Sequence, residues 1–237
     1  MPHAQVHGTD FAPAMVDCIR KRGEEAGVAN LTASVEDATQ LSGIEDETVD
    51  AVTCTWGMET SPDPMAVLRQ FHRVLRVGGL AVFAAWEKAP NAFAMKITNV
   101  MNELQGNNKM TTGMFSLGND GGDAAKKAME ETGFVEVKVS KIDIPLRAPA
   151  GTRYSDIFEC LTNPTPIEVV LAAMESHGRP KVREEACAIF EAQMEKDKAE
   201  GKLPRGPGLP APGEPAHDEN EPVFYFESLI VEGRKAE

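Results

Sequence analysis

The chain has 237 residues, of which 42% are hydrophobic and 26% are charged, and this composition is typical of a globular protein of one domain. A formal net charge of −13 opposes binding to a phosphate backbone, so we expect no nucleic-acid partner. The longest apolar run, Gly79 to Trp86, is too short to span a membrane, and the N-terminus has neither a basic nor an apolar signal region, so we expect a cytoplasmic protein without a membrane partner.

The cysteines and histidines predict no metal site. The four cysteines have no C-x-x-C spacing, and the five histidines share no helical face and no H-E-x-x-H pattern. We therefore expect reduced, mostly buried thiols and no bound metal.

Strands and helices alternate over the first 86 residues. Runs of β-forming or apolar residues predict strands at residues 5–9, 31–35, 50–55 and 80–86. A helix follows Ala12-Pro13 and is closed by Gly27, and a second helix covers residues 65–75, where apolar residues form one stripe. Gly78-Gly79 is predicted to be the turn before the last of these strands. Such alternation predicts βαβ units and a parallel sheet.

The rest of the chain has longer helices and irregular segments. Helices are predicted at residues 91–104, 123–132, 167–177 and 182–198, and strands at residues 134–146 and 223–231. Loops rich in glycine, asparagine and methionine or in proline and glycine occupy residues 105–122 and 204–222. The stretch Gly118 to Gly122 is interpreted as a helix-starting turn.

The order of these segments resembles the class I S-adenosylmethionine-dependent methyltransferases that act on small molecules. Val6 to Met15 is similar to the family's second strand and the turn after it, where an acidic residue, here Asp10, ends the strand. The pair Asp37-Ala38 follows the next strand, as in the family. Residues 50–52 with 74–79 resemble the fourth strand, the next helix and a glycine turn, and residues 223–234 resemble the closing antiparallel strand.

The resemblance implies an α/β fold with a Rossmann-like sheet, helices on both faces and an antiparallel last strand, within a single domain over residues 1–237. Residues 1–90 would form the cofactor-binding half, residues 91–122 and 147–222 the substrate-side helices and loops, and residues 123–146 and 223–234 the closing helix and strands. The family's first strand and its Gly-x-Gly-x-Gly turn should precede Gln5, where only Met1 to Ala4 stand. We therefore expect the first strand to be missing and the methionine half of the cofactor to be bound poorly.

The resemblance also implies the site residues. Asp10 would bind the ribose hydroxyls of S-adenosylmethionine, and Asp37 with the Ala38 backbone would bind the adenine, although either carboxylate could be only a turn residue and the neighbouring Glu36 could be the ligand. Other residues would line the site: Phe11, Met15, Thr55 and Trp56 on the cofactor side, and Trp86, Glu87, Asn91 and Phe93 on the substrate side. Core packing or loop capping is the alternative for these residues.

The implied function is methyl transfer to a small-molecule acceptor, impaired if the glycine turn is missing. Residues 86–93, 110–115 and 167–198 would cover the acceptor. No catalytic base is identified, because Glu59-Thr60 stands where the family has a His-His pair and His72 lies in the middle of a scaffold helix. Two alternatives stay open: a catalytically inactive methyltransferase-like fragment that binds a partner, and an NAD-dependent oxidoreductase, which does not explain Asp37-Ala38 or the last strand.

Overall fold

The structure is a computed structural model that describes residues 4–88, 93–106, 117–147, 152–162, 166–201 and 223–236. The chain forms two compact units, which are described separately. Unit 1 comprises Met1–Ala84, Ala125–Val139 and Val231–Glu237, and unit 2 comprises Ala85–Ala124 and Ser140–Ile230.

Unit 1 begins with a small parallel sheet. Strands β1 (Val6–Asp10) and β2 (Leu31–Val35) pair in register from Val6 with Leu31 to Asp10 with Val35, and helix α1 (Pro13–Glu25) connects them. The predicted bounds of β2 are confirmed, and those of β1 are shifted by one residue.

Two glycines let α1 lie close against this sheet. A Cβ atom added at Gly8 would lie 3.2 Å from Ile19 Cγ2, and one added at Gly23 would lie 2.6 Å from Leu31 Cδ2. Real side chains would therefore push the helix away from the strands. The chain leaves the helix through Gly27, whose φ of +65° lies in the left-handed region that favours glycine.

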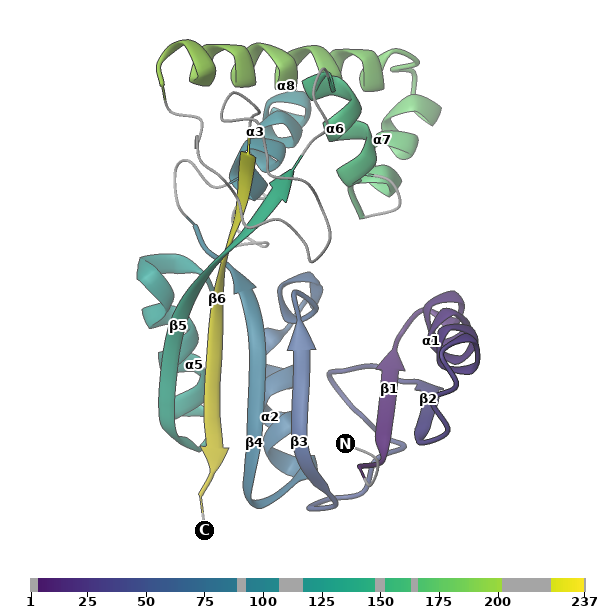
Figure 1. Cartoon of the computed structure of the whole chain (residues 1–237), viewed down its shortest axis with the longest axis vertical. Helices are drawn as coiled ribbons and strands as arrows, with labels where there is room; N and C mark the ends of the chain where they lie inside the picture. Colours follow the sequence, from purple (N-terminus) through teal and green to yellow (C-terminus); the bar gives the residue numbers. More distant parts are fainter. Residues whose placement is uncertain are drawn as a thin grey trace. The chain divides into compact units, whose positions relative to one another are not determined.

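A second, four-stranded sheet has the order β3-β4-β6-β5 (Figure 1). Its strands are β3 (Val49–Thr55), β4 (Leu75–Trp86), β5 (Phe134–Arg147) and β6 (Val223–Lys235). β3 and β4 are parallel, whereas β6, the last strand of the chain, runs antiparallel to β4. The expected α/β fold with a Rossmann-like sheet and an antiparallel last strand is confirmed.

Helix α2 (Pro64–Val74) connects β3 to β4, and helix α5 (Asp123–Glu131) precedes β5. The predicted stripe of α2 is buried at Val67, Leu68, Phe71 and Val74, and Asp63 caps the helix by accepting from the Ala66 amide at 2.9 Å. Before α5, Asn119–Gly122 forms a 3-10 turn, within the stretch that was predicted to be a helix-starting turn.

The start of β4 differs from the prediction. The strand begins at Leu75, which pairs with Val49, while the next pair joins Ala51 to Leu80. The four residues 76–79 of β4 thus stand opposite the single residue Asp50 of β3, and Gly78 has a φ of +76°. The predicted glycine turn is therefore a bulge inside β4 and not a turn before it, because β4 pairs with β3 on both sides of the bulge.

Arg73 of α2 fixes the connection between β2 and β3. Its guanidinium donates to the carbonyl oxygens of Ile44 at 2.9 Å and Leu41 at 2.8 Å, and it also pairs with Asp46. The Glu47 amide donates to the Arg73 carbonyl at 3.0 Å. The connection between β2 and β3 contains no helix, and the half-buried side chain of Arg73 therefore holds it against unit 1.

We predict that Arg73→Ala lowers the free energy of unfolding by about 2–4 kcal/mol, because several hydrogen bonds from a charged donor are lost at once. Chemical denaturation measures the change. Arg69→Ala is the control, since Arg69 is exposed and contacts Asp63 at 3.4 Å, and its effect should stay within about 0.5 kcal/mol. Equal effects of the two substitutions would contradict the anchoring role.

Unit 2 contains a cluster of helices. They are α3 (Phe93–Gln105), α6 (Tyr154–Thr162), α7 (Pro166–Ser176) and α8 (Val182–Ala199). Their shared core includes Met101, Phe158, Leu171 and Phe190, all at most 1% exposed. Helix α6 was not predicted, although Tyr154, Ile157 and Phe158 have helical spacing. Among the helices that the structure describes, none is long and apolar enough to cross a membrane.

A buried ion pair joins α3 to α8. The side chains of Lys96 and Asp197 are only 10% and 15% exposed and contact each other. We predict that Lys96→Met alone lowers the free energy of unfolding by about 3–5 kcal/mol, because it leaves Asp197 buried without its cation. The double variant with Asp197→Leu should recover most of the loss. A thermodynamic double-mutant cycle measures this, and additive losses would contradict it.

Candidate functional site

The carboxyl ends of β1 and β2 bring acidic side chains to one edge of the small sheet. Asp10 ends β1, and its register partner Val35 ends β2. The Glu36 amide donates to the Asp10 carbonyl at 3.0 Å, which continues the pairing past the strand end. Asp10, Glu36 and Asp37 therefore lie at the same edge, where ligands of parallel α/β sheets bind.

Asp10 has one carboxylate oxygen in use. Its Oδ1 atom accepts a hydrogen bond from the Ala12 amide at 2.8 Å, just before the first turn of α1. Within the described part of the chain, Oδ2 has no hydrogen-bond partner. The turn role and a ligand role are thus compatible, because they use different oxygens.

Asp37 is held more tightly. Its Oδ1 atom accepts from the Thr39 amide at 2.8 Å and from the Thr39 hydroxyl at 2.7 Å, and its Oδ2 atom accepts from Gln40 Nε2 at 3.2 Å. The Thr39 hydroxyl, followed by the Thr39 amide, holds the pKa of Asp37 below its ordinary value. Neighbouring Glu36 accepts from the Gly43 amide at 3.3 Å, and the Ala38 side chain is exposed.

Phe11 and Met15 are exposed next to this edge. Phe11 is 76% exposed and Met15 is 52% exposed, so the alternative that these two residues belong to the core is wrong. Exposed apolar side chains that lie together can form part of a binding surface, whereas ones scattered singly need no function.

The end of β3 forms a strained turn. Trp56 has a φ of 54°, which is rare for a bulky residue, and its amide donates to the Ala84 carbonyl at 3.1 Å. The preceding Thr55 is exposed. The 3-10 turn Met58–Thr60 that follows contains Glu59, whose side chain is buried. Glu59 is not among the predicted site residues, although an acidic residue four positions after the end of a parallel strand was a usable signal.

Two titratable groups of unit 1 are poor catalytic candidates. Burial raises the pKa of the Cys54 thiol, and the negative charge of Glu59 adds to this effect, so the thiol stays protonated at neutral pH. Burial and the charge of Lys235 lower the pKa of His72. The His72 ring packs edge-on against the Phe134 ring, with the two ring centroids 5.3 Å apart, which indicates a packing role.

The predicted substrate-side residues lie in unit 2. Trp86 ends β4, and a Cβ atom at Gly118 would lie 1.7 Å from the Trp86 carbonyl oxygen, so only glycine fits there. Glu87 Oε2 lies 2.7 Å from Lys141 Nζ. Asn91, the side chain of Phe93 and residues 110–115 lie outside the described residues.

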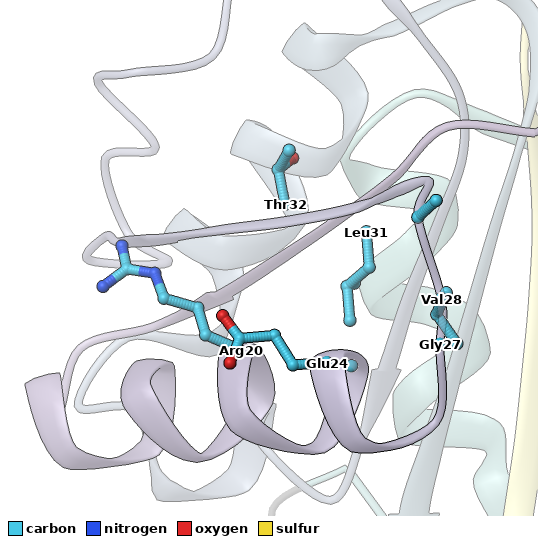
Figure 2. Close-up of a pocket in the computed structure, with 8 residues that line it drawn as sticks. Arg20, Glu24, Gly27, Val28, Leu31 and Thr32 are labelled. Carbon is cyan, nitrogen blue, oxygen red and sulfur yellow. The ribbon is translucent and has the colours of Figure 1, made fainter.

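A cavity of about 350 Å³ lies elsewhere in unit 1, between α1 and β2 (Figure 2). Arg20, Glu24, Leu31 and Thr32 line it, and none of the predicted site residues does. Because it involves the C-terminal half of α1 and the first residues of β2, it is at the amino end of the strand. Parallel sheets place their ligands at the opposite end.

Comparison with known proteins links the first part of the chain to one family. Residues 1–83 match the methyltransferase domain family. The chain is 34% identical over 94 residues to the ubiquinone biosynthesis O-methyltransferase of Xanthomonas oryzae, a match that covers 40% of this chain and 39% of the relative. The chain therefore spans about two fifths of the length of the curated relatives that it matches.

Solved structures share the fold over nearly the whole chain. A candidate methyltransferase of Bacillus halodurans has a TM-score of 0.58 at 18% identity, and the match covers 99% of this chain and 84% of that one. Haemonchus contortus phosphoethanolamine N-methyltransferase 2, solved with S-adenosylhomocysteine, has a TM-score of 0.51 at 14% identity, covering 98% of this chain and 44% of that one. At these identities the likeness shows the fold.

The hydrogen bonds to Asp37 predict a pH dependence. A carboxyl pKa that is lowered in the folded state stabilises the fold above the ordinary pKa, and this stabilisation is lost as the pH falls through the lowered pKa. Thr39→Val should therefore raise the pKa of Asp37 toward 3.8. At neutral pH the variant should then lose the contribution that the lowered pKa makes to the free energy of unfolding. NMR titration of the carboxyl carbon measures the pKa.

Thr48→Val is the matched control, because the Thr48 hydroxyl donates to the Glu45 carbonyl at 2.9 Å and does not contact Asp37. An Asp37 pKa that is the same in wild type and Thr39→Val would show that the Thr39 contacts do not hold this carboxylate.

Proposed function

We propose that this chain, a member of the class I S-adenosylmethionine-dependent methyltransferases by its matched domain and its fold, transfers a methyl group to a small molecule. The observation that carries the proposal is the acidic edge formed where β1 and β2 end together. An electrophilic methyl group on a sulfonium needs a positioned acceptor more than a strong base, so alignment of the two molecules supplies the catalysis.

The two carboxylates differ in what they can bind. Asp10 has Oδ2 open, so this atom would accept hydrogen bonds from the ribose hydroxyls of the cofactor. Both oxygens of Asp37 already accept hydrogen bonds within its own turn, so adenine recognition falls mainly to the shape and backbone of that turn. In the described part of the chain, the Ala38 amide donates to no acceptor, so it can donate to a ring nitrogen of adenine.

Exposed apolar side chains would cover the adenosine. Phe11 follows Asp10 directly and Met15 lies in the first turn of α1, and both have the exposed surface to cover a flat heterocycle. Thr55 ends β3 and Trp56 follows it, so both lie at the carboxyl end of a parallel strand, where the reacting end of the cofactor would lie. S-adenosylmethionine supplies the methyl group when bound, and these residues orient it.

Four residues near the end of β4 and the start of α3 are assigned to the acceptor side. Trp86 ends β4, Glu87 and Asn91 follow it in the chain, and Phe93 begins α3. Because Glu87 is paired with Lys141, it would act as a fixed polar contact and not as a free base. The acceptor is a small molecule, as expected for an acidic chain with a formal charge of −13.

A second function, that of a partner-binding module without catalysis, is favoured by one observation. Among the described residues, β1 and β3 each pair with a neighbour on one side only. Open strand edges bind other polypeptide segments, and this property is independent of cofactor binding.

Substitution of Asp10 tests the cofactor site. Asp10→Asn keeps an oxygen for the Ala12 amide but removes the charge and puts an NH₂ group on the ribose side. We expect the affinity for S-adenosylhomocysteine to fall about 10- to 100-fold, since a hydrogen bond to a charged group contributes about 1.5–3 kcal/mol. Isothermal titration calorimetry measures the loss.

Asp17→Asn is the control, because Asp17 lies on the exposed side of α1 and pairs with Arg20 at 3.2 Å. It should leave the affinity unchanged. If Asp10→Asn binds the ligand as tightly as wild type while circular dichroism shows an intact fold, Asp10 does not bind the ribose.

A further inference from the structure

The cavity between α1 and β2 combines opposite charges with an apolar wall. The side chains of Arg20 and Glu24 leave α1 one turn apart and extend toward β2, and Leu31 points from β2 toward the helix (Figure 2). Val28, which is 43% exposed, lines the same cavity. The cavity volume of about 350 Å³ is at the lower end for small-molecule sites and is enough for one amino acid.

The Arg20 guanidinium is fixed at the outer edge of β2. Its Nη2 atom donates to the Ala33 carbonyl at 2.8 Å, and its Nη1 atom donates to the Asp17 carboxylate at 3.2 Å. Because a guanidinium has five N–H donors, these two bonds hold its position while other donors stay available for a ligand. A planar carboxylate is the group that fits such a fork of donors.

The Glu24 carboxylate is open to a cation. Lys21 of the same helix pairs with Glu25 at 3.9 Å, and among the described residues no cationic side chain pairs with Glu24. Glu24 also lies in the last turn of α1, where the helix dipole favours a positive charge. An ammonium group beside Glu24 would therefore be stabilised both by the carboxylate and by the end of the helix.

The backbone of Leu31 adds a hydrogen-bond acceptor. The Asn30 carbonyl accepts from β1 at 2.9 Å, and in a parallel pair the backbone direction alternates along the strand, so the Leu31 carbonyl points to the outer edge of β2. The contact of Arg20 with the Ala33 carbonyl agrees with this direction, because Ala33 lies two residues further along the strand. An ammonium group in the cavity can donate to the Leu31 carbonyl.

The lining favours a ligand that carries both charges. Glu24 and the formal charge of −13 oppose a simple anion such as phosphate, and Arg20 opposes a simple cation. An α-amino acid carries a carboxylate and an ammonium group on one carbon atom, which matches two opposite charges one helical turn apart. The half-buried Leu31 and the exposed Val28 offer apolar surface to an aliphatic side chain.

We propose that this cavity binds a free α-amino acid with an aliphatic side chain. Arg20 binds the carboxylate, Glu24 and the Leu31 carbonyl bind the ammonium group, and Val28 packs against the side chain. The cavity lies at the amino end of β2, whereas the candidate functional site lies at the carboxyl end. The two sites are therefore separate, and this binding does not depend on the proposed methyl transfer.

A ¹H–¹⁵N NMR titration of the full chain with L-leucine tests the proposal. We expect saturable shifts at the backbone amides of Gly27, Val28 and Thr32, which line the cavity. N-acetyl-leucine lacks the ammonium group and represents the carboxyl end of a polypeptide, and leucine amide lacks the carboxylate and represents the amino end. Each analogue should bind about tenfold more weakly than leucine or worse, because a hydrogen bond to a charged group is lost.

Substitutions in α1 assign each charge of the ligand. Arg20→Gln and Glu24→Gln should each weaken leucine binding about tenfold or more. Glu24→Gln should not weaken the binding of N-acetyl-leucine further, because that ligand has no ammonium group. Arg22→Gln and Glu25→Gln are the matched controls, since these residues lie on the same helix outside the cavity lining, and they should leave the affinity unchanged.

The proposal is overturned if leucine produces no saturable shifts at the cavity, or if its shifts are confined to residues 10–15 and 36–40 of the candidate functional site. It is also overturned if Arg20→Gln and Glu24→Gln bind leucine as tightly as their matched controls. An analogue that binds as tightly as leucine would overturn the assignment to a free amino acid, because the end of a polypeptide would then fit equally well.

Discussion

Hydrogen bonding between parallel strands is the constraint on which the candidate site depends. The register that pairs Val6 with Leu31 also pairs Asp10 with Val35, so the two strands end level and their acidic residues meet. A slip of one residue would turn every side chain of one strand to the other face. The glycines at positions 8 and 23 support this arrangement, because they allow α1 to lie against the paired strands.

The same alternation divides the small sheet into two unlike faces. Gly8 and Leu31 face α1, while His7 lies on the opposite face and contacts the hydroxyls of Thr32 and Ser34, each at 2.8 Å. A polar face needs no covering helix, which agrees with the direct connection from β2 to β3. Arg73 replaces a packed helix there, because one guanidinium satisfies several carbonyl oxygens of that connection.

The acidic residues at the strand ends can use their carboxylate oxygens either for hydrogen bonds within a turn or for a ligand. Asp10 stabilises the start of α1 with one oxygen and leaves the other for a ligand, whereas Asp37 uses both oxygens in its own turn. A strand-end carboxylate can therefore be a turn residue and a binding residue together.

The sequence by itself determined the parallel arrangement, the bounds of β2 and the stripe of α2, because these depend on local periodicity and on turn residues. The selection of Asp10 and Asp37 came from the family resemblance, because on the residues alone each could be only a turn residue at a strand end. Tertiary structure decided the start of β4, where pairing with β3 extends the strand across Gly78-Gly79. It also decided the burial of Glu59 and the exposure of Phe11, because burial depends on which distant segments cover a side chain, and local periodicity does not contain that information.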